Sequence, residues 1–499
     1  MPHDLVIRDA VLFDGSGSPG FVGDVAVDDD RIAAVCAKQA GGVASRGGVE
    51  VAAQGLALAP GFIDVHSHDD FAALLEPELP FKLLQGVTTE VVGNCGMGAA
   101  PFDAAADVLR MFHRGRALAP WSGFAELFAR YRAEPASANL AVLAGHGTFR
   151  NAVAPEARRP LDAGERVALQ RLLTEALDAG VVGLSTGLVY EPGRHADSTE
   201  LVELGVLLTR AGALHTTHLR SEAHQLLEAV DEAISVSERT GVSLQLSHHK
   251  AYGRSNWGRV EASLARVDVA RASGIDVWLD QYPYTAASTL LVSLVSRGAL
   301  VGSGRRPSEL LPEDVVISSL VGHPKLEGAT LAALSRLWGV TPVDAARRVL
   351  EYDADAWVVV HAMCEDDVRR VMRHPATLIG SDGIPSERGR PHPRLFGTFP
   401  RVLGHYARDE GVLTLPEAIH RMTGLSARRF GLAERGHLSE GSYADLVLFD
   451  PATVADRATF DEPRAAPSGL SGVWVNGRAV VRDGIHLGAR PGRLLARAA

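Results

Sequence analysis

Residues 61–70 read GFIDVHSHDD, and this stretch decides the fold. The run GFIDV is short, apolar and bounded by glycine on one side, as expected of a buried parallel strand. It leads into two histidines, His66 and His68, which are separated by a single residue. Because side chains alternate along a strand, His66 and His68 point to the same side. Two imidazoles that face the same way at a strand end are a good pair of metal ligands.

Apolar runs like the first recur through the middle of the chain, with amphipathic stretches of helical spacing between them. Residues 161–180, LDAGERVALQRLLTEALDAG, are typical of these helices. Strands that alternate with helices in this way form a parallel sheet covered by helices. Eight such units predict an α/β fold of the TIM type, a (β/α)8 barrel. The seven further runs are 86–93, 140–145, 181–187, 213–218, 243–248, 275–280 and 376–382.

The two ends of the chain differ from the middle in their pattern of apolar and polar residues. Both contain short alternating strands, and the Asn-Gly pair at 476–477 is a strong hairpin signal. We therefore predict a small β-sandwich domain built from residues 1–59 and 431–499, with the catalytic α/β barrel over residues 60–430. About 95 residues separate the seventh and eighth runs, which is too long for a structureless loop. We expect residues 287–350 to form an inserted lid segment within the barrel.

The composition excludes several classes of protein. A formal charge of −10 argues against binding to nucleic-acid phosphates. The apolar runs are shorter than the ~20 residues that a membrane helix needs, and the N-terminal residues lack the features of a signal peptide. Three cysteines make a poor disulfide framework, so we expect a cytoplasmic protein. The sequence leaves the oligomeric state open.

Active sites of such barrels lie at the carboxyl ends of the strands, so the residues there are the candidates for chemistry. Metal-binding and acid–base side chains follow strands one, two, five, six and eight: His66, His68, Cys95, His218, His248 and Asp382. A thiolate combined with imidazoles suits Zn²⁺, although cobalt or iron fits the same ligands. A water bound to zinc has its pKa lowered to about 7. A carboxylate beside that water, here Asp382, can serve as general base and then as general acid.

With these strand ends in place, the chain resembles the D-aminoacylase family, the N-acyl-D-amino-acid deacylases of the amidohydrolase superfamily. The resemblance extends over nearly the whole chain, and its motifs are jointly specific. They are GFIDVHSHDD (61–70), GNCG (93–96), THLRSE (217–222), SHHK (247–250), YPYTA (282–286), GSDG (380–383) and PHPRLFGTFPRVLGHY (391–406).

This resemblance implies hydrolysis of an N-acyl-D-amino acid, a small-molecule substrate, to a carboxylate and a free D-amino acid. It also implies a zinc held tightly by Cys95, His218 and His248, and a weaker second metal site lined by His66 and His68. In the same way it implies that Asp382 is the general base and acid, and that the insertion covers the pocket as a lid. The D configuration of the substrate rests on the resemblance alone.

Two cations are candidates for binding the carboxylate of the substrate. Lys250 lies two residues beyond His248, so alternation directs it into the pocket as a partner for the α-carboxylate. Arg394 follows Asp382 on a loop with prolines at 391 and 393, and a guanidinium can hold a carboxylate through two hydrogen bonds. A solvated surface position is the plain alternative for both side chains.

Four uncharged side chains are weaker candidates for substrate binding. Tyr190 follows the fourth strand and can donate a hydrogen bond to a carboxylate or carbonyl oxygen. His146 follows the third strand and either lines the site or packs beneath it. Tyr282 and Ser288 follow the seventh strand, where we expect them to shape the pocket for the side chain of the substrate.

The fourth strand argues against two related activities. Many binuclear relatives bridge two metals with a carboxylated lysine at the end of this strand, but residues 181–193, VVGLSTGLVYEPG, contain no lysine. Cys95 can take that ligand role, which disfavours a hydantoinase or a dihydroorotase. Another amidase or dipeptidase of the superfamily remains as an alternative. A non-catalytic barrel has no need of the full ligand set together with Asp382.

The sequence of the insertion is relevant to which substrate side chain the protein prefers. Residues 293–314 include three arginines, Arg297, Arg305 and Arg306. If one of them reaches the pocket, the protein is an N-acyl-D-glutamate or N-acyl-D-aspartate deacylase. Because arginines in insertions are usually solvated, we expect a hydrophobic or broad preference instead.

Overall fold

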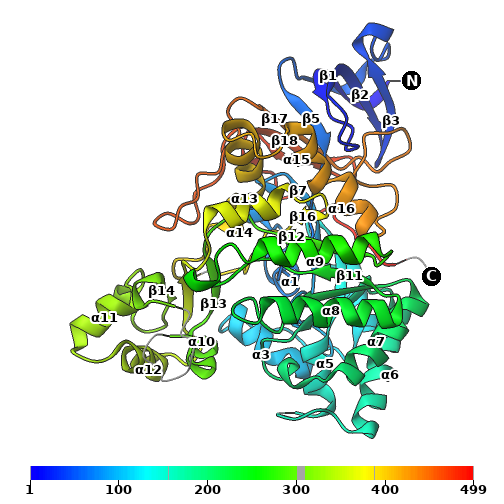
Figure 1. The fold of residues 1–499 in the computed structure, drawn as a ribbon. Coiled ribbons are helices and arrows are strands. Elements are labelled where there is room, and N and C mark those ends of the chain that lie inside the picture. Colours follow the sequence, from blue (N-terminus) through cyan, green and yellow to red (C-terminus); the bar gives the residue numbers. More distant parts are fainter. Residues whose placement is uncertain (1, 156, 301–309, 387, 498–499) are drawn as a thin grey trace.

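The computed structural model describes residues 2–155, 157–300, 310–386 and 388–497. Figure 1 shows a central barrel, a sheet domain at one end of the molecule and the insertion beside the barrel. None of the helices among these residues is long and apolar enough to cross a membrane.

The predicted barrel strands are confirmed. They form one parallel sheet in the order β16-β12-β11-β10-β9-β8-β7-β6. Nearly all of their residues are buried, because the barrel core covers one face and the helices cover the other. The strands are β6 (Phe62–Asp64), β7 (Val87–Val92), β8 (Asn139–Gly145), β9 (Gly183–Gly187), β10 (Leu214–His218), β11 (Ser243–Leu246), β12 (Val277–Gln281) and β16 (Thr377–Ile379).

The barrel helices begin and end where local chemistry dictates. α6 (Ala163–Ala179) begins at a capping box, in which the Asp162 side chain accepts from the backbone N–H of Glu165, and ends at Gly180 with φ of 107°. The other helices are α1 (Ala72–Leu75), α2 (Pro80–Leu83), α3 (Phe102–Phe112), α4 (Phe124–Ala133), α5 (His146–Val153), α7 (Ser198–Ala211), α8 (Leu226–Thr240), α9 (Val260–Ala272), α13 (Glu365–Arg373), α14 (Arg394–Arg401), α15 (Leu415–Met422) and α16 (Gly424–Arg429).

The barrel closes between its first and last strands, β6 and β16, just beyond their carboxyl ends. Ser67 and Gly383 form a parallel bridge there. The backbone N–H of Asp382 donates to the carbonyl of His66 at 2.7 Å, and that of His68 donates to the carbonyl of Gly383 at 3.2 Å. We call this contact the seam. It places both histidines of GFIDVHSHDD beside Asp382.

The two chain ends form one domain, as predicted. The strands join into a single sheet in the order β20-β19-β18-β17-β5-β1-β2-β3, with β4 paired to β1. They are β1 (His3–Leu12), β2 (Phe21–Asp28), β3 (Arg31–Ala37), β4 (Gly47–Ala52), β5 (Ala57–Pro60), β17 (Leu446–Phe449), β18 (Leu470–Val475), β19 (Arg478–Arg482) and β20 (Ile485–His486).

This sheet packs against itself rather than as two separate sheets. Leu5 and Val25 from the N-terminal strands share a buried core with Leu446 and Trp474 from the C-terminal strands. The last described residues leave the sheet and return to the barrel. Leu494 forms a bridge with Leu140, and the N–H of Arg497 donates to the carbonyl of Gly180. The tail therefore packs against the beginnings of β8 and β9.

The insertion is a small folded unit whose apolar core also includes Tyr252, Tyr282 and Tyr284 of the barrel rim. It consists of β13 (Ala287–Leu290), α10 (Leu291–Arg297), β14 (Val315–Ser319), α11 (Leu331–Trp338), α12 (Pro342–Tyr352) and β15 (Trp357–Val360). Its three strands follow the order β13-β15-β14. The unit starts at residue 287, where we expected it, but extends past 350, because β15 is the central strand of its sheet.

Candidate metal centre and pocket

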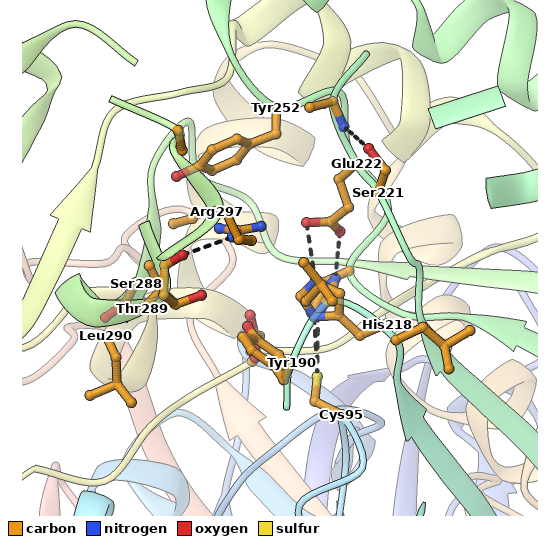
Figure 2. A pocket seen from close by; sticks show the side chains of 18 of the residues that line it. Cys95, Tyr190, His218, Ser221, Glu222, Tyr252, Ser288, Thr289, Leu290 and Arg297 are labelled. Atoms are coloured by element: carbon orange, nitrogen blue, oxygen red, sulfur yellow. Dashed lines mark hydrogen bonds and ion pairs between the residues drawn. The ribbon is translucent and has the colours of Figure 1, made fainter. Parts of the chain in front are cut away.

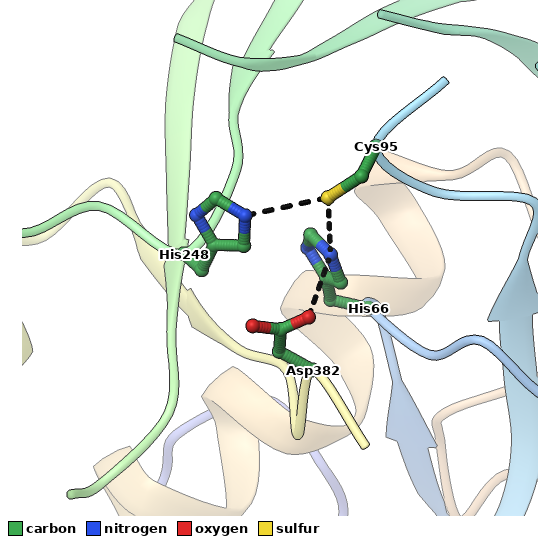
Figure 3. Close-up of side chains that lie close together, drawn as sticks. All are labelled: His66, Cys95, His248 and Asp382. Atoms are coloured by element: carbon green, nitrogen blue, oxygen red, sulfur yellow. Dashed lines mark hydrogen bonds and ion pairs between the residues drawn. The ribbon is translucent and has the colours of Figure 1, made fainter. Parts of the chain in front are cut away.

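Four strand-end side chains converge in the barrel mouth (Figure 3). Ligand atoms of His66, Cys95, His248 and Asp382 all lie within 4.8 Å of one another, and all four residues are buried. The sulfur of Cys95 is at the centre, 3.4 Å from His66 Nε2 and 3.3 Å from His248 Nε2. It also lies 3.7 Å from His218 Nδ1. The structure thus brings Cys95 together with three of the four predicted imidazole ligands.

The fourth imidazole, that of His68, contacts Asp382. His68 Nε2 lies 3.1 Å from Asp382 Oδ1, and His66 Nε2 lies 3.5 Å from the same oxygen. Asp382 therefore faces both histidines of the first strand.

The spacing of these atoms fits a metal ion. Sulfur and nitrogen ligands of a tetrahedral zinc lie about 3.6 Å apart, given the usual Zn–S and Zn–N bond lengths. The distances from Cys95 Sγ to the three imidazoles, 3.3, 3.4 and 3.7 Å, agree with this value. The donor set, one thiolate with neutral imidazoles, is also the one that zinc prefers.

Three members of the group have an unusual backbone conformation. Cys95, His248 and Asp382 have φ values of 55°, 35° and 49°, a region that residues other than glycine rarely adopt. Hydrogen bonds hold two of them in place: the N–H of His248 donates to Asp280 Oδ1 and that of Asp382 to the carbonyl of His66, both at 2.7 Å. Strain of this kind persists only where the surroundings enforce it, as they do at functional sites.

Neighbouring side chains favour the ionised forms of Cys95 and Asp382. Burial alone raises the pKa of the Cys95 thiol, but the neighbouring His248 and His66 outweigh it and hold that pKa well below its usual range. Burial likewise opposes ionisation of Asp382. The Arg394 guanidinium, with Nη1 2.7 Å from Asp382 Oδ2, outweighs it and keeps the pKa of that carboxyl well below its usual range. Both side chains are therefore anions at neutral pH.

Two acidic residues that we did not identify from the sequence orient the histidines. Glu222 Oε1 lies 3.0 Å from His248 Nδ1, and its Oε2 lies 3.6 Å from His218 Nε2, so Glu222 lies on the side of His218 away from Cys95 (Figure 2). Asp280 Oδ1 lies 3.0 Å from His66 Nδ1. A carboxylate behind a ligating imidazole sets its orientation and tautomer. The available signals were the place of Glu222 in THLRSE and that of Asp280 near the end of the seventh strand.

A cavity of about 430 Å³ opens over the metal group. The predicted residues Tyr190, Lys250, Tyr282 and Ser288 line it together with five of the six metal-site candidates, all but His66. The insertion contributes a wall that includes Arg297, whereas Arg305 and Arg306 lie outside the described residues. The barrel rim and the insertion thus enclose the cavity together.

Arg394 is placed differently from our expectation. Its side chain is buried and does not line the cavity over the metal group. It holds a carboxylate, as predicted, but that carboxylate belongs to Asp382. Its guanidinium also lies over the ring of Tyr282, 4.5 Å from the centroid. This geometry lets Arg394 ionise and orient Asp382.

His146 also lies away from the cavity. It is fully buried at the start of α5, and its Nε2 lies 2.7 Å from Glu200 Oε1. Glu200 in turn pairs with the buried Arg150. Because α5 begins at His146, the ring turns toward α7 instead of the pocket. The structure therefore does not bring His146 to the cavity, and the residue joins α5 to α7 instead.

The chain is similar over its whole length to enzymes of known activity. The profile described as "Amidohydrolase family" matches residues 49–287 and 313–481. N-acyl-D-glutamate deacylase from Alcaligenes xylosoxydans xylosoxydans is 41% identical over 99% of this chain and 96% of its own. D-aminoacylase from the same organism is 39% identical over 100% and 98%.

A solved structure agrees with the fold. N-acyl-D-glutamate deacylase from Bordetella bronchiseptica, complexed with zinc and a phosphonate that mimics the tetrahedral intermediate of its reaction, superposes with a TM-score of 0.89. Its sequence is 40% identical to this one, and the match covers 99% of this chain and 100% of that chain.

Proposed function

This chain belongs to the D-aminoacylase branch of the amidohydrolase family, and on that premise we propose that it hydrolyses N-acyl-D-amino acids. The products are a carboxylate and a free D-amino acid. The observation that carries the proposal is the convergence of Cys95, three imidazoles and an ionised Asp382 at the base of a 430 Å³ cavity. A cavity of this size suits a small amide rather than a polymer.

The metal would be held chiefly by Cys95, His218 and His248, with His66 and His68 forming a weaker second site. When bound, zinc supplies an acidified water and polarises the carbonyl of the amide. Asp382 is poised to take a proton at Oδ1, because its other oxygen is held by Arg394. The same carboxyl then returns the proton to the nitrogen of the departing amino acid.

Lys250 and two tyrosines are the proposed binders of the substrate carboxylate. Lys250 Nζ lies 2.5 Å from Glu222 and 5.5 Å from the ring centroid of Tyr282, and it borders the cavity. Burial raises the pKa values of Tyr190 and Tyr282, so both phenols stay protonated and can donate hydrogen bonds. A cation with two neutral donors is a suitable partner for one carboxylate.

One residue favours an acidic substrate as the second candidate. Arg297, at the end of α10, lines the cavity, and its Nε donates to the carbonyl of Ser293 at 3.0 Å (Figure 2). A guanidinium in the wall can bind the carboxylate of a D-glutamate or D-aspartate side chain. Leu188, Leu290 and Ile384 in the same wall favour the hydrophobic or broad preference that we expected.

The test is amine release from N-acetyl-D-methionine, N-acetyl-D-glutamate and N-acetyl-L-methionine by protein of known zinc content. We expect turnover of at least one D compound, none of the L compound, and loss of turnover in Asp382→Asn. The ratio of the two D rates decides between the hydrophobic and acidic candidates. Turnover of none of the three by zinc-loaded protein contradicts the proposal, and N-terminally acidic dipeptides would then be tried as substrates of the alternative dipeptidase.

We also infer a cytoplasmic location. All three cysteines, Cys36, Cys95 and Cys364, are free thiols, and the metal group requires a reduced Cys95. A reducing compartment keeps that thiol available.

A further inference from the structure

A buried cluster of charges lies directly beneath the seam and is not used by the proposed chemistry. At its centre is Lys82, on α2, whose side chain is fully buried. Its Nζ lies 2.5 Å from Asp64 Oδ2, 3.1 Å from Asp69 Oδ2 and 3.4 Å from Glu90 Oε2. Moving an ammonium group out of water costs several kcal/mol unless its partners compensate. Three carboxyl groups surround Lys82 and compensate this cost, which indicates that the cluster has a specific structural role.

The cluster joins the two strands that meet at the seam. Asp64, at the end of β6, accepts from the N–H of His66 at 3.2 Å and from the N–H of Ser381, beyond β16, at 2.8 Å. Its other oxygen accepts from the Ser381 hydroxyl at 2.6 Å. Within the described residues β6 and β16 share no regular ladder, only the bridge between Ser67 and Gly383. Side chains therefore carry much of the connection.

Ser381 connects this cluster to Asp382. Its hydroxyl donates to Asp64 and accepts from Lys82 Nζ and from the N–H of Gly383, both at 2.9 Å. A hydroxyl has one donor and two acceptor sites, so all of them are used. The hydrogen bonds at positions 381 and 383 fix both neighbours of Asp382, whose φ of 49° is strained.

The turn also packs tightly against the lysine. A Cβ placed on Gly383 would lie 2.9 Å from Ser381 Oγ and 3.3 Å from Lys82 Nζ. The turn therefore has little room to move toward the cluster. If Lys82 or the Ser381 hydroxyl is removed, the strained turn is free to relax, and the Asp382 carboxylate moves with it.

The carboxyl groups around Lys82 lie close enough together to affect one another's ionisation. Burial first, and the neighbouring Asp69 second, raise the pKa of Glu90 well above its ordinary value. Glu90 therefore takes up a proton more readily than an ordinary carboxyl group. Asp64, 2.5 Å from Lys82 Nζ, is the member of the cluster that contacts the turn.

We propose that Lys82, acting through Asp64 and Ser381, is a positioning residue for Asp382, and that the cluster sets the distance of this carboxylate from His66 and His68. The effect on turnover rests on the proposed function. The effect on metal binding does not, because Asp382, His66 and His68 face one another whatever the substrate is.

The decisive variant is Ser381→Ala, which removes one hydroxyl and leaves every charge in place. We expect kcat to fall at least tenfold, while KM stays within about twofold, because substrate-binding residues are untouched. The affinity for a second Zn²⁺, measured by equilibrium dialysis against one-zinc protein, should weaken about tenfold. The affinity for the first zinc should change much less, because none of its proposed ligands, Cys95, His218 and His248, belongs to the turn.

The matched control is Ser426→Ala. Ser426 is equally buried, and its hydroxyl donates at 2.6 Å to the carbonyl of Arg421, which is not a member of the cluster. It should cost stability but leave kcat and both zinc affinities at their wild-type values. Lys82→Met should repeat the Ser381→Ala pattern with a larger loss of kcat. If Lys82→Met does not fold, Ser381→Ala decides alone.

The two proposals fail in different ways. A wild-type protein that turns over no N-acyl-D-amino acid contradicts the proposed function, and the second-zinc affinity of Ser381→Ala still tests the cluster. Wild-type turnover together with a Ser381→Ala protein that matches the wild type in kcat and second-zinc affinity overturns the cluster proposal and leaves the function standing.

Discussion

The barrel rim and the insertion enclose the same cavity but are built in different ways. On the rim, buried side chains are held by several partners each, as Glu222 is by His218, His248 and Lys250. The insertion packs around an apolar core that also includes Tyr252, Tyr282 and Tyr284 of the barrel rim, and ion pairs nearer the surface add to this contact. Arg114 pairs with Asp353 on one side, and Arg254 pairs with Asp314 on the other.

This difference separates chemistry from specificity. The rim holds the metal ligands and Asp382 through several contacts each, and catalysis requires groups that are held in a fixed geometry. The insertion supplies Ser288 and Arg297 to the wall of the cavity without contacting the metal group. Changes in the insertion can therefore alter which side chain is accepted while the reaction stays the same. The predictions below test this division.

The largest effect should come from the rim, in Asp382→Asn. The amide cannot take the proton, so we expect kcat to fall by about 10² to 10⁴, a typical range for loss of a general base. Zinc bound by Cys95, His218 and His248 should stay, and metal analysis of the purified variant checks this. Loss of the first zinc together with activity would mean that Asp382 is chiefly a ligand.

Glu222→Gln should weaken the metal centre itself. The neutral amide orients His218 and His248 less well, and loss of such a partner typically costs 10- to 100-fold in metal affinity. Competition with a chelator measures the zinc affinity. Glu232→Gln is the control, since Glu232 pairs with Arg220 at a partly exposed position on α8. Equal zinc affinities in the two variants would show that Glu222 does not support the metal centre.

Arg297→Gln tests the insertion. If Arg297 binds an acidic side chain, kcat/KM for N-acetyl-D-glutamate should fall about 10- to 100-fold, as for loss of a charged hydrogen bond. The value for N-acetyl-D-methionine should stay within about twofold. Arg347→Gln, an exposed arginine of the same insertion, should change neither. A parallel loss for both substrates would show that Arg297 supports the wall and does not select substrates.

The smallest effect concerns acid stability, and we expect it in the barrel. His215, on β10, is buried with its Nε2 3.0 Å from Thr186 Oγ1, and burial lowers its pKa to about 4. The unfolded chain takes up a proton near pH 6.5 but the folded chain does not. Stability is therefore full above pH 6.5 and is lost as the pH falls toward 4, by about 2 kcal/mol at pH 5.

His215→Gln should remove this part of the pH dependence, as measured by chemical unfolding at pH 8 and pH 5. His323→Gln, at an exposed site in the insertion, should leave it as in the wild type. A wild-type pH profile in His215→Gln would show that other buried groups of the barrel cause the acid sensitivity.

The parts of the fold predicted from sequence are those that depend on local periodicity. The eight barrel strands, the sheet domain from both chain ends and the start of the insertion follow from runs, caps and turns within short windows. The convergence of Cys95, His218, His248 and Asp382 follows too, because the carboxyl ends of parallel strands share one rim. Lys250 and Tyr190 border the cavity for the same reason.

The tertiary structure alone decided which side chains pair with one another. Arg394 binds Asp382, His146 binds Glu200, and Lys82 joins the seam, and each of these contacts spans residues far apart in the chain. Alternation predicts a direction only for regular strands, whereas Cys95, His248 and Asp382 have a left-handed backbone that redirects their side chains. The sequence therefore determined which residues reach the rim, and long-range packing determined the partner and the role of each.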